Sequence, residues 1–128
     1  MIIVNEDNSI YLTRGDDVVF DVGATIGGET FTFNAGDNVH FIVTEKKNCG
    51  AVVLDKTIPV TTDSETVRIR LTNEETKIGG VISKPIDYWY DIELIDRLGN
   101  VQTLVGYDED GAKIFRLFPE GDLEGGNE

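Results

Sequence analysis

The chain has few of the residues that support covalent or metal chemistry. Its 128 residues include one cysteine, Cys49, and one histidine, His40. A single cysteine cannot form a disulfide within the chain, and a single histidine excludes a metal site built from several histidines. We therefore expect no metal, no cofactor and no disulfide framework.

Basic residues are also scarce. Eleven lysines and arginines stand against 24 aspartates and glutamates, which gives a net charge of −13 at pH 7. A surface this acidic repels the phosphates of nucleic acids and the headgroups of anionic membranes. Neither is expected as a partner.

Long apolar runs are missing. The amino-terminal segment Met1-Ile2-Ile3-Val4 lacks the basic residues of a signal peptide, and its apolar run stops there. No window of the sequence approaches the roughly 20 apolar residues that span a bilayer. We expect synthesis in a cytoplasm, where the lone cysteine stays reduced.

Apolar residues rarely recur with the spacing of a helix, and never over more than a turn or two. They alternate with other residues at a period of two instead. Apolar residues alternate with others through 18–22, 39–43, 67–71 and 88–94, and the third run is the most regular. Such short runs, separated by Gly-, Asn- and Asp-rich turns, are typical of an all-β sandwich or barrel. The expected core residues are Val18, Phe20, Val39, Phe41, Leu54, Val67, Ile69, Leu71, Tyr90, Ile92 and Leu94.

Two kinds of connection are predicted between these strands. Gly99-Asn100 and Asp110-Gly111 suit hairpin turns, because Gly and Asn tolerate positive φ, and two such turns would make the last three strands a meander. Thr72 and Glu75 have the spacing of a capping box, which predicts one short helical turn after the strand at 67–71.

The end of the chain differs in composition from the rest. Residues 119–128 contain four acids, three glycines and no basic residue. Such a segment has too little apolar surface to offset the entropy of ordering. We expect one β-sandwich domain over residues 1–118 and a flexible acidic tail over 119–128.

Two motifs resemble binding signatures but have simpler explanations. Arg14-Gly15-Asp16 spells an integrin-binding tripeptide, yet Gly36-Asp37 precedes another strand in the same way, which favours a turn. The acids Asp108, Glu109 and Asp110 suggest a calcium loop, but they lack EF-hand spacing and suit a hairpin tip.

Catalytic groups do not form a recognisable set. His40 has no obvious nucleophile beside it, and Cys49 has no placed histidine, although Lys46 and Lys47 precede it closely. Ser9, Ser64 and Ser83 lie in turns without the flanking glycines of a nucleophile elbow. We expect no enzymatic activity and no catalytic residue.

Trp89 is out of phase with the predicted core. Tyr88 and Tyr90 share a face with Ile92, so Trp89 must point the other way, with Asp91 and Glu93. A tryptophan on a polar face is either covered by a loop or available to a partner, since aromatic residues are enriched at interface cores. Trp89, Asp91 and Glu93 are therefore the candidate interface.

An ordered set of motifs resembles a family of virion proteins. The set comprises residues 12–16, 33–37, 39–43, 67–72, 88–94 and 99–103. It is similar to the N-terminal domain of phage baseplate upper proteins and to related immunoglobulin-like phage domains, over about Ile10 to Phe118. The resemblance implies an immunoglobulin-like antiparallel β-sandwich built for assembly into a virion, with no catalytic residues. Those proteins continue into a helical linker, whereas this sequence continues into an acidic tail, so a head, neck or tail accessory protein fits as well as a baseplate protein.

The function expected from the sequence is that of a non-catalytic structural or assembly module of a phage or prophage particle. Its partners would be other virion proteins or a second copy of itself, and it would be located in the virion after synthesis in the cytoplasm of the bacterial host. The alternative is a β-sandwich that binds carbohydrate or another host-surface ligand, with Trp89 stacking on a sugar ring while Asp91 and Glu93 accept hydrogen bonds from its hydroxyl groups.

Overall fold

Strands account for most of the regular structure. The computed structural model describes residues 2–26, 28–47, 49–105 and 112–120, and strands make up 56% of them, with no helix in this part of the chain. The strands in chain order are β1 (Ile2–Val4), β2 (Ile10–Thr13), β3 (Val18–Val22), β4 (Thr25–Ile26), β5 (Glu29–Thr30), β6 (Asn38–Lys46), β7 (Cys49–Pro59), β8 (Val67–Leu71), β9 (Ile86–Ile95), β10 (Val101–Val105) and β11 (Lys113–Phe118).

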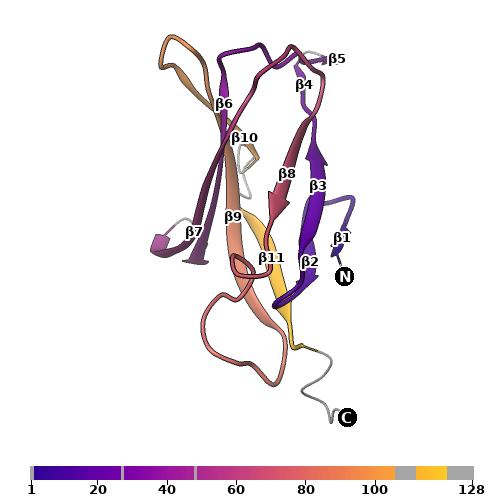
Figure 1. Ribbon diagram of the computed structural model, residues 1–128, viewed down its shortest axis with the longest axis vertical. Coiled ribbons are helices and arrows are strands. Elements are labelled where there is room, and N and C mark those ends of the chain that lie inside the picture. The colour runs from indigo at the N-terminus through magenta and orange to yellow at the C-terminus, as the bar shows by residue number, and fades with distance from the viewer. Residues whose placement is uncertain (1, 27, 48, 106–111, 121–128) are drawn as a thin grey trace.

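The strands form one large sheet and two small ones. The large sheet has the order β1-β2-β11-β9-β6-β7, with β10 also paired to β9, while β3 pairs with β8 and β4 with β5. The β3–β8 pair lies over one face of the large sheet (Figure 1), and the apolar core fills the space between them. The predicted all-β, sandwich-like character is confirmed.

The expectation of a purely antiparallel arrangement is wrong at one position. β2 runs parallel to β11, with Ile10 opposite Phe115 and Leu12 opposite Leu117. A parallel pair needs a long connection, and here nearly the whole domain lies between the two strands. This pairing brings the first and last parts of the domain together.

The predicted meander is also wrong. The turn at Gly99-Asn100 forms, with Gly99 at φ +89°, and it joins β9 to β10. β11 then pairs with the first half of β9 and β10 with the second half, both on the edge opposite β6. The two strands therefore follow one another along the same edge of β9. The other predicted turn, Asp110-Gly111, lies outside the described residues.

The predicted helical turn is a hydrogen-bonded turn instead. Its capping bonds do form, because the Thr72 backbone N–H donates to the Glu75 carboxylate (2.9 Å) and the Glu75 N–H donates to the Thr72 hydroxyl (3.3 Å). No helix follows, since the Thr76 hydroxyl is tied to the Asp16 carbonyl and Ile78 enters the core. These tertiary contacts outweigh the local helix signal.

The predicted core is confirmed. All eleven residues expected to be buried are buried, and Phe41 lies at their centre, with its ring 5.7 Å from Phe20, 5.5 Å from Tyr90 and 6.1 Å from Phe115 between centroids. Further core residues come from short strands and loops: Ile10, Leu12, Phe33, Val60, Ile78, Ile82 and Leu117.

The start of the predicted tail contacts the domain. The Glu120 carboxylate lies 2.6 Å from a guanidinium nitrogen of Arg14. Residues 121–128, on which the predicted flexible tail depends, lie outside the described part of the chain. Among the described residues, no helix is long and apolar enough to cross a membrane.

Candidate functional site

The two faces of β9 have different environments. Tyr90, Ile92 and Leu94 point into the core, and the alternate residues Trp89, Asp91 and Glu93 point to the opposite side of the large sheet. We call that side the outer face. Its three candidate residues are half-buried rather than fully exposed. The sequence prediction that Trp89 is out of phase with the core is confirmed.

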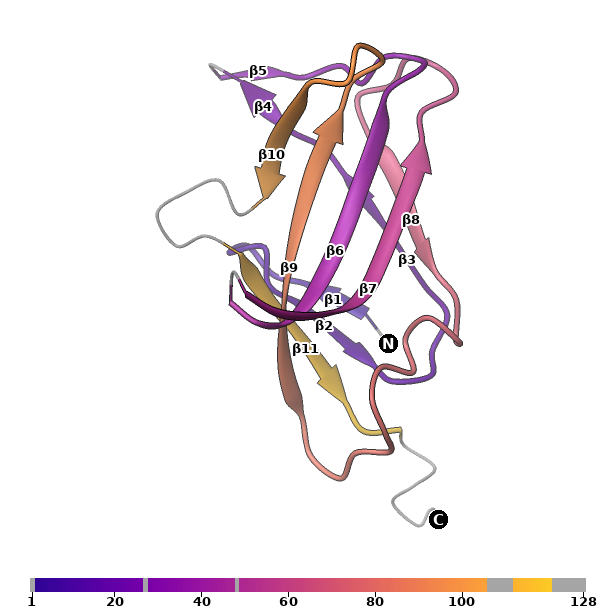
Figure 2. The ribbon, with the colours of Figure 1, turned by 90° about the vertical axis from the view of Figure 1, so that its left-hand side faces the viewer.

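The end of the β6–β7 hairpin covers part of this face. The register between β6 and β7 shifts between Val43 and Thr44 and again before Lys46, and bulges of this kind bend a strand pair. The bent hairpin end crosses in front of β9 (Figure 2). It places the Lys47 ammonium 5.7 Å from the centroid of the Trp89 ring, so a loop partly covers the tryptophan.

His40 joins three strands of the outer face. Its Nε2 lies 2.5 Å from an Asp55 carboxylate oxygen on β7, and its Nδ1 lies 3.2 Å from a Glu93 carboxylate oxygen on β9. Burial lowers the pKa of His40, but the two carboxylates raise it by more, so the net pKa is above the ordinary value. The histidine is thus held as a charge bridge, and Glu93 is already engaged.

Asp91 lies next to this bridge in a less favourable environment. Burial, followed by the negative charge of Glu93, raises the pKa of Asp91. Its cross-strand neighbour on β6 is the aliphatic Ile42. Asp91 makes no ion pair with the residues that the structure describes. A cation placed over it would stabilise its charged form.

A second charged group lies at the other end of the outer face. The Arg116 guanidinium forms two bonds to the Asp87 carboxylate (2.6 and 3.1 Å), and its carbon lies 4.9 Å from the centroid of the Tyr11 ring. Tyr11 in turn packs against Phe118, with ring centroids 5.8 Å apart. The charged groups at this end of the face are therefore paired with each other within the protein.

The Arg14-Gly15-Asp16 tripeptide forms a structural turn. Arg14 is only 8% exposed and donates hydrogen bonds to the carbonyls of Ile78 (3.4 Å) and Gly79 (3.0 Å). Gly15 has φ +86°, as a tight turn before β3 requires. An arginine held in this way is not presented to a receptor, which supports the simpler interpretation.

The remaining sequence candidates are not brought together. Ser9 is buried and bonded to Asp7, Ser64 pairs with Phe33 across a bridge, and Cys49 begins β7 opposite Lys46. The suggested calcium loop at 108–110 lies outside the described residues. Within the described ranges, no three His, Cys, Asp or Glu side chains are grouped to hold a metal ion.

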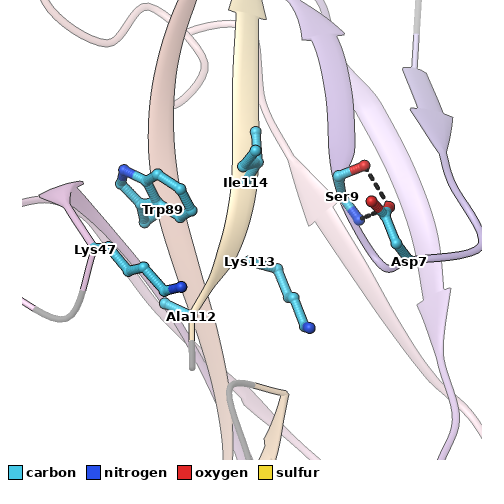
Figure 3. Close-up of a pocket in the computed structure, with 7 residues that line it drawn as sticks. All are labelled: Asp7, Ser9, Lys47, Trp89, Ala112, Lys113 and Ile114. Atoms are coloured by element: carbon cyan, nitrogen blue, oxygen red, sulfur yellow. Dashed lines mark hydrogen bonds between the residues drawn. The ribbon is translucent and has the colours of Figure 1, made fainter. Parts of the chain in front are cut away.

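Sequence reasoning missed a pocket beside Trp89. The pocket has a volume of about 280 Å³ (Figure 3) and is lined by Asp7, Ser9, Lys47, Trp89, Ala112, Lys113 and Ile114. These residues come from the β1–β2 turn, the β6–β7 turn, β9 and the start of β11, so no local pattern connects them. The one signal in the sequence was Trp89 itself.

No family model, curated protein or solved structure matches the chain.

Proposed function

We propose that this protein is a non-catalytic assembly module of a tailed-phage or prophage particle, and that it docks through the outer face of its large sheet. The partner is a different virion protein that presents apolar and basic groups. The motif resemblance to immunoglobulin-like phage domains supports a role in a phage particle. That resemblance implies an immunoglobulin-like sandwich, and the two stacked sheets are compatible with one.

One observation carries the proposal: the two faces of the large sheet are covered unequally. The inner face packs against β3 and β8, whereas no sheet lies over the outer face among the described strands. That face nevertheless carries Trp89 with Ile114 opposite it and Ile42 two residues further along the neighbouring β6. Aromatic and aliphatic groups at the centre of a half-buried face are typical of protein interfaces.

The charges of this face favour a basic partner over a second copy. Asp91, with its raised pKa, has no cation beside it in the described structure, and Asp55 and Glu93 share a single histidine. The whole chain carries a net charge of −13, so two copies repel each other. A lysine or arginine from the partner would relieve the repulsion between Asp91 and Glu93.

The carbohydrate alternative has less support at these three residues. Glu93 is held by His40, and about 13 Å of extended strand separates it from Trp89 at roughly 3.3 Å per residue. A sugar ring stacked on Trp89 would not reach it.

Purification of particles from the host strain that carries the gene tests the proposal. Wild-type protein and the control Val19→Ala, whose apolar side chain is exposed on β3, should be present in the particles. Trp89→Ala should be depleted at least about tenfold, as expected for a central interface aromatic. Absence of the wild-type protein from particles would overturn the role, and normal incorporation of Trp89→Ala would overturn the assignment of the face.

Sedimentation of the isolated protein at low and high salt separates the two kinds of partner. Docking on a basic protein weakens as salt screens the attraction, whereas contact between identical acidic chains strengthens. We expect a monomer at every salt concentration. A dimer fraction that increases with salt and disappears in Trp89→Ala would show that the partner is a second copy of the chain and not a basic protein.

A further inference from the structure

We infer that the free edge of β7 binds an extended segment of the partner protein, which adds to the large sheet as a further strand and places a lysine or arginine beside Asp55. This inference rests on the proposed assembly role and names the way in which the partner docks. The edge continues the outer face, because Asp55 and Thr57 lie opposite Ile42 and His40 of the neighbouring β6.

β7 is the longest edge strand of the large sheet. Its 11 residues pair with β6 on one side, and no described strand pairs with it on the other (Figure 2). The other edge strands of this sheet are β1, which has three residues, and β10, whose five residues contain an irregularity in register. An added strand of typical length has about five or six residues, so β7 is the edge that suits one best.

The backbone groups that face this edge can be assigned from the ladder. The N–H and C=O of Val60 both bond to residues just before β6, at 2.8 and 2.9 Å. Because these directions alternate along an antiparallel strand, and the register is regular here, the N–H and C=O of Asp55 and Thr57 point away from β6. Pro59 lies at an equivalent position and lacks an N–H, as a position that faces away from the ladder allows.

The outward-pointing groups are available to another strand. The backbone N–H and C=O of Asp55 and Thr57 have no hydrogen-bond partner among the described residues. A row of such groups is a template for strand pairing, and an extended peptide binds it through main-chain hydrogen bonds. The chemistry of the edge therefore selects an extended segment.

Lys56 does not prevent this pairing. An inward-pointing charged residue often protects an edge strand, because an added strand would bury its charge. Lys56 lies opposite Phe41 on the inner side, but its ammonium lies 2.8 Å from the Glu75 carboxylate and also donates to the Arg70 carbonyl of β8. An added strand would cover a lysine that keeps both partners.

The side chains of the edge favour a basic residue in the added segment. The Asp55 side chain is 58% exposed, and its ion-pair partner His40 also bridges to Glu93. In an antiparallel pair, the residue directly opposite Asp55 would lie on the same face with its Cβ about 5 Å away, where an opposite charge is stabilising. A lysine or arginine at that position fits the basic partner proposed above.

Amide hydrogen exchange tests the edge without a variant. In the isolated protein, the N–H groups of Asp55 and Thr57 should exchange at least about a hundredfold faster than those of Lys56 and Ile58, which point toward β6. In purified particles, exchange at Asp55 and Thr57 should slow at least about tenfold, because the added strand supplies acceptors. Mass spectrometry with residue resolution measures both states.

Two substitutions at one position separate the backbone from the side chain. Thr57→Pro removes an outward N–H, which an edge strand tolerates, and should deplete the protein from particles at least about fivefold. Thr57→Ala keeps the N–H and should be incorporated as wild type. Circular dichroism checks the folding of each, and the exchange measurement decides the inference if Thr57→Pro does not fold.

A third substitution tests the charge of the added segment. Asp55→Asn keeps the backbone and removes the negative charge, and it should deplete the protein from particles about two- to fivefold, as expected for one cross-strand charge pair. Incorporation of Asp55→Asn equal to that of the wild type would overturn the basic residue of the partner.

Three results would overturn strand addition itself. They are slow exchange of the Thr57 N–H in the isolated protein, unchanged exchange in the particle, and depletion of Thr57→Ala equal to that of Thr57→Pro. Normal incorporation of folded Thr57→Pro together with loss of Trp89→Ala would overturn strand addition and leave the assembly role in place. Absence of the wild-type protein from particles would overturn the assembly role, so the two failures are distinguishable.

Discussion

The two faces of β9 show how one strand serves two purposes. On the inner face, Ile92 and Leu94 are buried under β3 and β8, and the Tyr90 hydroxyl donates a hydrogen bond to the Asn8 carbonyl. On the outer face, Trp89, Asp91 and Glu93 are half-buried, and Trp89 and Glu93 contact the charged side chains of Lys47 and His40. The inner residues stabilise the fold, and the outer ones form the proposed docking surface.

The two faces contribute to stability through different interactions, apolar burial on the inner face and ion pairs on the outer face. Apolar burial contributes about 25 cal/mol per Å² removed from water, whatever the exact geometry. Partly exposed ion pairs such as His40–Asp55 contribute less than about 1 kcal/mol each. The outer face can therefore be changed at low cost to stability, which is the property that a binding surface needs.

Truncation of an inner residue should have the largest effect. Ile92→Ala removes a side chain that is 2% exposed, and we expect a loss of about 2–5 kcal/mol in unfolding free energy. Trp89→Ala should cost less, although its side chain is larger, because it is only half-buried. Urea denaturation of both variants measures the contrast, and an equal or greater loss for Trp89→Ala would contradict it.

Removal of one hydroxyl from the inner face should have an intermediate effect. The Tyr90 hydroxyl lies 2.5 Å from the Asn8 carbonyl oxygen, and burial raises the pKa of this phenol. Tyr90→Phe should cost about 1 kcal/mol, the net contribution of one hydrogen bond. Tyr88→Phe is the control, since its hydroxyl makes no hydrogen bond in the described structure. Thermal or urea unfolding that ranks the two variants in the opposite order would show that the Asn8 contact is unimportant.

The smallest expected effect is the change in unfolding free energy that a pH change causes through the His40 bridge of the outer face, and its sign is defined. The pKa of His40 is raised in the folded protein by Asp55 and Glu93, with Asp91 as the next acid on the same face. The stabilisation is therefore complete below the unfolded pKa of about 6.5 and is lost as the pH rises through the folded pKa. It should amount to less than about 1 kcal/mol, because the Asp55 side chain is 58% exposed.

The matched variant isolates this contribution. Between about pH 6 and about pH 8, the unfolding free energy of the wild type should fall by more than that of His40→Gln, because only the wild type loses the charged imidazole of the bridge as the pH rises. Identical pH profiles for the two proteins would show that the bridge seen between the strands contributes nothing in solution.

Alternation along single strands was enough to predict much of the fold. Ile69 and Ile92 were assigned to the core, and Trp89 away from it, because side chains in a strand alternate between faces. The parallel β2–β11 pair was not predictable, since β2 has only four residues and its partner lies about a hundred positions away. Phe33 and Ile78 were missed because they enter the core from loops, where no period applies.

The candidate site could be predicted only in part. The sequence shows that Trp89, Asp91 and Glu93 share a face, but it cannot show which strands lie beside them. His40 is 53 residues from Glu93 and 15 from Asp55, and only the register of β6 between β7 and β9 brings the three together. The contact between Lys47 and Trp89 depends on the bulges that bend the β6–β7 hairpin. No local sequence pattern predicts these bulges.

Oxidative footprinting of Trp89 tests the central claim, that the outer face is the docking surface. Hydroxyl radicals label exposed side chains, and mass spectrometry of the isolated and particle-bound protein compares their reactivity. We predict that Trp89 oxidation falls at least about fivefold in the particle, as expected for a desolvated interface aromatic, while Val19, which is 42% exposed on the opposite layer, reacts equally in both states. Equal oxidation of Trp89 in the two states, or protection of Val19 instead, would contradict the account.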